Sequence, residues 1–110
     1  CILNAVNTVV IPSGHFYDVI PCGVSIQNAR TSFIGDTLTR DGYHLSLNTG
    51  RYIAGLTYYM KITGNSIDNI TYVPNSTDIT PLKLEVIKES VKNAIANPNS
   101  ITNSKYTQQN

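Results

Sequence analysis

Residues 18–23 read Asp-Val-Ile-Pro-Cys-Gly, the only convincing strand signal in the chain. A short apolar run between turn-forming residues is typical of a strand buried in a parallel sheet. Pro21 lacks the amide that a central strand donates, so we place it at the end of this strand. Because one strand cannot form a sheet alone, its partners must come from elsewhere. The stretch therefore predicts an α/β fold of which this chain holds one strand and several helices.

Helical spacing of apolar residues surrounds this predicted strand. The expected helices cover residues 2–10, 24–30, a long segment ending near residue 63 and a second long segment over 81–97. Ser46 or Asn48 is a candidate cap for the first long helix, and Gly64-Asn65 ends it. Thr80-Pro81 begins the second, because Thr caps helices and Pro fits their first position. Asn97-Pro98 ends it.

The length of 110 residues is enough for one small domain, which we assign to residues 1–98, with residues 99–110 as a polar, flexible tail. The chain has 8 basic and 7 acidic residues and a net charge of +1. No basic stripe is present, which argues against nucleic acid or a membrane surface as a partner. The apolar runs are shorter than the roughly 18–20 residues that span a bilayer.

The stretch Thr-Arg-Asp-Gly-Tyr-His-Leu-Ser at residues 39–46 contains the candidate catalytic residues Asp41 and His44. A serine hydroxyl becomes a nucleophile when an imidazole takes its proton, and a carboxylate at the other ring nitrogen sets the required tautomer. Three residues on a tight loop, with Gly42 to allow the turn, bring the two side chains together. The alternative interpretation is a turn aspartate followed by a half-exposed loop histidine.

These residues resemble the last sequence block of SGNH-type (GDSL-family) serine hydrolases, an Asp-x-x-His ahead of the C-terminal helix. The stretches at 28–32, 41–46 and 50–54 are similar to a bacterial subfamily with no assigned substrate, and the resemblance covers roughly residues 1–64. It implies the C-terminal part of a flavodoxin-like three-layer α/β/α fold. It also implies His44 as general base and acid, Asp41 as its orienting carboxylate, no metal or other cofactor, and an extracytoplasmic, periplasmic or secreted, location.

The resemblance further implies a small-molecule or glycan ester as substrate and a missing N-terminal part of the same domain as partner. Ser13, Ser25, Ser32 and Ser46 stand outside any Gly-Asp-Ser context, so we assign none of them as nucleophile. The chain by itself is therefore expected to be inactive, because it lacks the attacking atom and the oxyanion donors.

Gln27, Asn28 and Arg30 follow the carboxyl end of the predicted strand, the end that faces the ligand crevice in open α/β sheets. We therefore predict that these residues contact substrate. The alternative for Arg30 is a surface side chain with a structural hydrogen bond.

Other function classes stay open at this stage. One is a non-catalytic helical interaction module, or a degenerate hydrolase that only binds. A metal-dependent hydrolase would use His15 with Asp41 and His44, although no His-x-x-x-His spacing supports a closed ligand set. Cys1 is compatible with a lipid-modified protein start, but the apolar residues after it favour a truncated chain, and Cys22 fits a reduced, packed residue.

Overall fold

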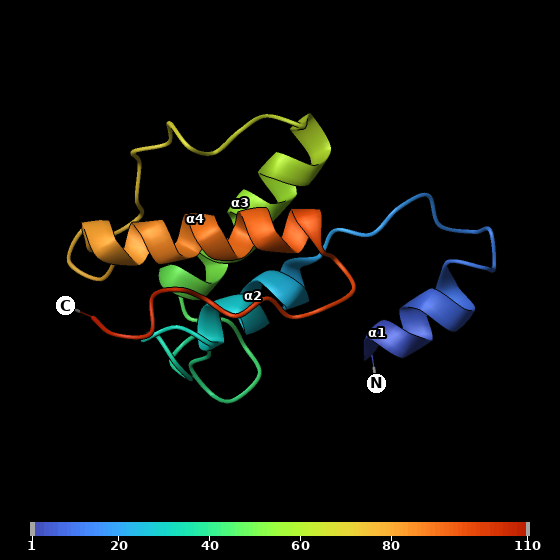
Figure 1. Ribbon diagram of the computed structural model, residues 1–110, viewed down its shortest axis with the longest axis horizontal. Coiled ribbons are helices and arrows are strands. Elements are labelled where there is room, and N and C mark those ends of the chain that lie inside the picture. Colours follow the sequence, from blue (N-terminus) through green and yellow to red (C-terminus); the bar gives the residue numbers. More distant parts are fainter. Residues whose placement is uncertain (1, 110) are drawn as a thin grey trace.

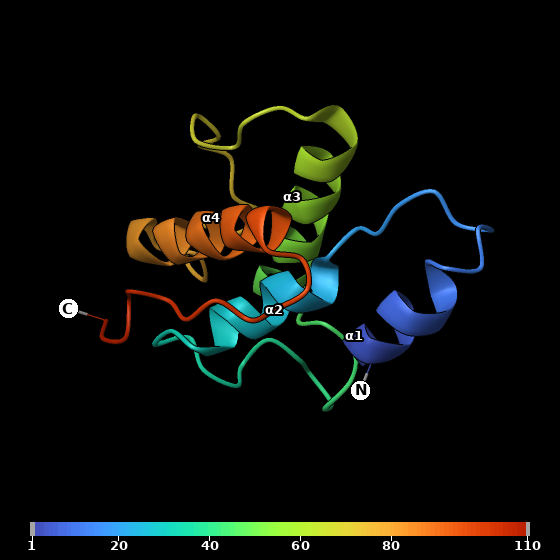
Figure 2. The same ribbon diagram turned by 45° about the vertical axis from the view of Figure 1, so that its right-hand side comes forward.

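The computed structural model describes residues 2–109, and predictions about Cys1 concern a residue outside this range. The elements in chain order are α1 (Ile2–Ala5), the π-helix η1 (Val6–Val10), α2 (Cys22–Arg30), α3 (Thr49–Thr63) and α4 (Pro81–Ala96). Figure 1 shows α2, α3 and α4 packed together, with α1 and η1 set apart on an extended linker. Figure 2 shows that α3 runs steeply across α4.

The cap geometry confirms the predicted start of α4 and the predicted end of α3, whereas the Asn48 side chain makes no cap hydrogen bond at the start of α3. The Thr80 hydroxyl accepts a hydrogen bond from the Lys83 amide at 3.3 Å, and Pro81 is the first helical residue of α4. At the end of α3, Gly64 has φ +71° and its amide donates to the Met60 carbonyl. Glycine adopts this left-handed conformation without the steric penalty of a side chain, so it stops the helix.

The core lies where α2, α3 and α4 meet. It contains the fully or nearly fully buried side chains of Ala29, Ile34, Leu38, Ile53, Leu56, Ile67, Ile79, Val86, Ile87 and Val91. Ile34, Leu38, Ile67 and Ile79 come from the loops between the helices, so these loops pack into the core with the helices. Burial of such side chains contributes about 1.5–3 kcal/mol each, which makes this three-helix core the main source of stability.

The predicted α/β architecture is wrong for the described residues. No strand or sheet is present in residues 2–109, where the sole β-type pairing is the isolated bridge between Thr39 and Leu45. The expected strand is instead an irregular segment, and α2 begins at Cys22 directly after Pro21. The apolar run is short and has no partner strand, so these residues lead into a helix that packs on α3 and α4.

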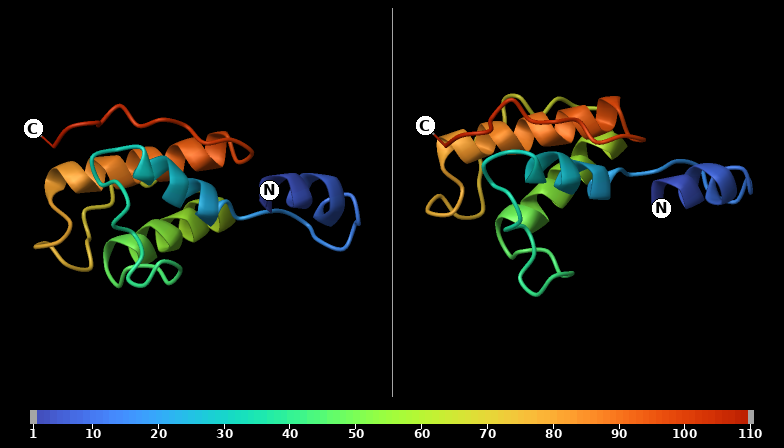
Figure 3. Two further views of the ribbon diagram at one scale, coloured as in Figure 1. Left: turned by 90° about the horizontal axis from the view of Figure 1, so that it is seen from below. Right: turned by 60° about the horizontal axis from the view of Figure 1, so that its bottom comes forward.

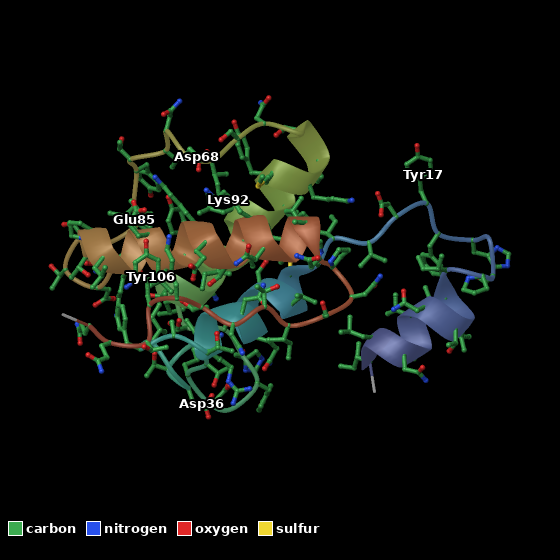
Figure 4. The ribbon with its side chains drawn as sticks, viewed as in Figure 1. Tyr17, Asp36, Asp68, Glu85, Lys92 and Tyr106 are labelled. Atoms are coloured by element: carbon green, nitrogen blue, oxygen red, sulfur yellow. The ribbon has the colours of Figure 1, made fainter. Side chains whose placement is uncertain are left out.

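The first predicted helix is confirmed as α1 and η1. Gly14, which follows it, has φ +76°, a left-handed conformation that does not continue a helix. However, neither α1 nor η1 contains a buried residue. Apolar side chains of α1 and η1, together with the Val19–Pro21 segment, line an open cavity of about 480 Å³. Figure 4 shows Tyr17 of the linker pointing away from the rest of the chain.

Residues 99–109, where the sequence predicts a flexible tail, run beside α2 and α4 (Figure 3). The Thr102 amide donates to the Asn28 side-chain oxygen at 2.7 Å, and the Ser104 amide donates to the Thr31 hydroxyl at 2.7 Å. These bonds connect the end of the chain to α2. No helix in the described residues is both long enough and apolar enough to cross a membrane.

Candidate functional site

The candidate catalytic residues lie on a loop that is closed at its base. Thr39 and Leu45 form the antiparallel bridge, and the Arg40 amide donates to the His44 carbonyl at 2.9 Å. Gly42 at the tip has φ +94°, the left-handed region that favours glycine. In the right-hand view of Figure 3, the loop before α3 projects away from the three helices. The loop therefore presents its tip outside the core.

Asp41 faces back into the loop and binds three donors. Its Oδ1 atom accepts hydrogen bonds from the His44 amide at 2.7 Å and the Tyr43 amide at 3.2 Å. Its Oδ2 atom is hydrogen-bonded to Nδ1 of the His44 ring. The imidazole bond, followed by the His44 amide bond, lowers the pKa of the Asp41 carboxyl below its ordinary value. Asp41 is therefore an ionised acceptor that holds the histidine by both main chain and ring.

This contact determines which ring nitrogen of His44 remains available. An ionised carboxylate only accepts, so Nδ1 carries the proton and Nε2 keeps its lone pair when the ring is neutral. The side chains of His44 and Asp41 are 52% and 39% exposed, so the pair is accessible to a reacting group. The Tyr43 ring packs on the imidazole with 4.3 Å between ring centroids. The arrangement can take up a proton from an incoming hydroxyl.

None of the four serines considered from the sequence is bonded to this histidine. Ser13, Ser25 and Ser32 donate to carbonyl oxygens of their own segments. The Ser46 hydroxyl accepts from the Gly50 amide at 2.8 Å. The described residues thus provide a carboxylate and an imidazole, but no hydroxyl in contact with them.

The three residues predicted to contact substrate lie on α2, but Asn28 has different partners from Gln27 and Arg30. Asn28 is 1% exposed, and its amide group donates to the Ser90 carbonyl at 3.1 Å and accepts from the Thr102 amide. It therefore connects α2 to α4 and to the C-terminal segment. Arg30 donates to the Gln27 side chain at 3.0 Å and pairs with Asp36 at 3.3 Å. Within the described residues, no hydrogen bond or ion pair joins Arg30 or Gln27 to the Asp41–His44 pair.

Potential metal ligands do not gather in the described part of the chain. Residues 2–109 contain no group of three or more His, Cys, Asp or Glu side chains placed to hold a metal ion. His15 lies in the exposed segment between η1 and α2, whereas Asp41 and His44 lie on the loop before α3. Burial raises the pKa of the Cys22 thiol, which favours its protonated form over the thiolate that binds metals.

A polar cavity of about 450 Å³ lies beside α4, where the sequence did not indicate a site. Lys88 is 9% exposed and donates to the Asp68 carbonyl at 2.9 Å, and Lys92 pairs with the Asp68 carboxylate at 2.8 Å. Glu85 and Tyr106 lie at the same face of α4 (Figure 4). Lys88 and Lys92 are one helical turn apart, and this sequence spacing could have indicated a basic face on α4. The spacing does not indicate that Asp68 packs against that face.

Comparison with known proteins identifies one family and one solved structure. Residues 4–97 match the family described as "Domain of unknown function (DUF4886)". The crystal structure of a DUF4886 family protein from Bacteroides uniformis ATCC 8492 is similar, with 40% sequence identity and a TM-score of 0.83. The match covers 92% of this chain and 38% of that one, so this chain spans well under half the length of its relative. A comparison with curated proteins found no match.

Proposed function

Since this chain belongs to the DUF4886 family and spans 38% of the length of its relative of known structure, we propose that it is the acid–base part of a longer serine ester hydrolase. The observation that carries this proposal is the contact between the Asp41 carboxylate and Nδ1 of His44 on an exposed loop. The resemblance to SGNH-type hydrolases supports the same roles for these two residues. The serine and the oxyanion donors come from the remainder of the longer polypeptide.

The proposed reaction proceeds through an acyl-enzyme. His44 takes the serine proton at Nε2 while the serine oxygen bonds to the ester carbonyl carbon. The resulting imidazolium, stabilised by the Asp41 carboxylate, gives that proton to the departing alcohol oxygen. Water then loses a proton to the same nitrogen and attacks the acyl carbon. The imidazolium gives that proton to the serine oxygen as the bond to the acyl carbon breaks, which releases the acid and restores the serine. Suitable substrates are small or glycan esters.

An experiment with two polypeptides tests this function. The longer polypeptide carrying this sequence is incubated with an aryl acetate and with an organophosphonate that modifies activated serines; the 110-residue chain is the matched control. We expect aryl acetate turnover and a single phosphonate adduct in the longer polypeptide, and neither in the control. A folded longer polypeptide with no turnover and no adduct contradicts the hydrolase proposal and supports a role in binding alone.

A further inference from the structure

Two residues that lie outside the Asp-x-x-His motif join its loop to the first turn of α3. The Ser46 amide donates to the Leu38 carbonyl at 2.8 Å, and the Ser46 hydroxyl accepts from the Gly50 amide at 2.8 Å. Leu38 precedes the loop, Ser46 follows it, and Gly50 belongs to the helix. These two bonds therefore connect both sides of the loop base to a helix that is anchored in the core.

Gly50 allows this close approach because it has no side chain. A Cβ atom at this position would lie 2.6 Å from the Leu38 carbonyl oxygen, 3.0 Å from the Ser46 hydroxyl and 3.2 Å from Leu45 Cβ. The first of these distances is too short for a carbon next to a main-chain oxygen, so the loop base or the helix would have to move. Gly55 in the same helix has no atom within 4 Å of a corresponding Cβ.

The loop tip has little else to hold it. Both side chains of the Asp41–His44 pair are substantially exposed, and exposed ion pairs contribute little to order on their own. The hydrogen bonds at the tip join residues of the loop to one another, so they keep their geometry only while the two sides of the loop stay closed at its base, where the Ser46 amide donates to the Leu38 carbonyl. Its position on the helix is set by the contacts at its base, where the Ser46 amide donates to the Leu38 carbonyl and the Gly50 and Arg51 amides donate to the Ser46 hydroxyl and carbonyl.

We propose that Ser46 and Gly50 are positioning residues for His44, because they lock the loop base against α3 and so fix the place and tautomer of the imidazole. This inference rests on the proposed function only in treating His44 as the catalytic base. A catalytic group must be held to within about 0.5 Å of its productive position, and a misplacement of about 1 Å lowers rates by about 10²-fold.

The test compares Gly50→Ala with Gly55→Ala, a matched substitution in the same helix with open space around it. Two-bond ¹H–¹⁵N spectra of the imidazole in the 110-residue chain report which ring nitrogen carries the proton. We expect Gly55→Ala to keep the Nδ1–H pattern of His44 and Gly50→Ala to shift the ring toward Nε2–H. In the longer polypeptide, we expect Gly50→Ala to lower aryl acetate turnover by about 10²-fold, with Gly55→Ala close to wild type.

Ser46→Ala and Ser46→Thr keep the test decisive if Gly50→Ala fails to fold. Alanine removes the acceptor of the Gly50 amide, whereas threonine retains a hydroxyl, so we expect threonine to restore both the tautomer and the turnover. Unchanged spectra and turnover in Gly50→Ala and Ser46→Ala would overturn the positioning role alone. Absence of turnover in the wild-type longer polypeptide would instead overturn the proposed function, while leaving the tautomer result interpretable.

Discussion

Replacing His44 with alanine in the longer polypeptide is expected to lower aryl acetate turnover by about 10⁴-fold. The substitution removes the group that takes the proton from the nucleophile and gives it to the leaving alcohol. Since His44 is exposed on a projecting loop and contributes no core packing, the variant is expected to keep the stability of the parent. Steady-state hydrolysis and thermal unfolding, measured on the same preparation, separate these two effects.

His15→Ala is the matched control, because His15 is the other of the 2 histidines in the sequence and lies in the exposed segment before α2. We expect this variant to hydrolyse the ester at the rate of the parent. Equal activity of His44→Ala and the parent, with both folded, contradicts a catalytic role for His44. Equal loss in both histidine variants would point to a general effect of the substitution on folding.

Replacing Ile53 with alanine is expected to lower the free energy of unfolding of the chain by about 2–5 kcal/mol. Ile53 is 0% exposed in the middle of the three-helix core, so its truncation leaves a cavity that the surrounding helices fill only in part. A loss of this size is a large fraction of the roughly 5–15 kcal/mol that stabilises a typical domain. Urea unfolding followed by circular dichroism measures it.

Ile62→Ala is the control on the same helix, because Ile62 is 70% exposed. Its effect on the free energy of unfolding is expected to stay within about 0.5 kcal/mol, as for most surface substitutions. Similar losses in the two variants would contradict the three-helix core, since they would mean that α3 does not present Ile53 inward.

The helices could be predicted from the sequence because their start and stop signals are local. The Thr80 cap acts on an amide three residues away, and Gly64 ends α3 through its own backbone conformation. The strand at residues 19–22 was predicted wrongly because strand formation depends on a partner. An apolar run of this length fits a strand or the approach to a helix equally well, and the packing of α2 on α3 and α4 decided the outcome.

In the candidate site, too, contacts between residues close in sequence could be predicted, whereas contacts between distant residues could not. The Asp41–His44 contact was predicted because it spans three residues of one loop. The burial of Asn28 was missed, since its amide partners Ser90 and Thr102 lie 62 and 74 residues away in the sequence. The close approach of Gly50 to Leu38 likewise follows from how the loop folds back onto α3, and no spacing rule indicates it.

The tautomer of one imidazole in the 110-residue chain tests the central claim most directly. With the ring neutral, two-bond ¹H–¹⁵N spectra should show His44 protonated at Nδ1 with a bare Nε2, and Asp41→Asn should abolish this preference. A wild-type ring protonated mainly at Nε2 would contradict the claim, because that nitrogen could then take no proton from a serine.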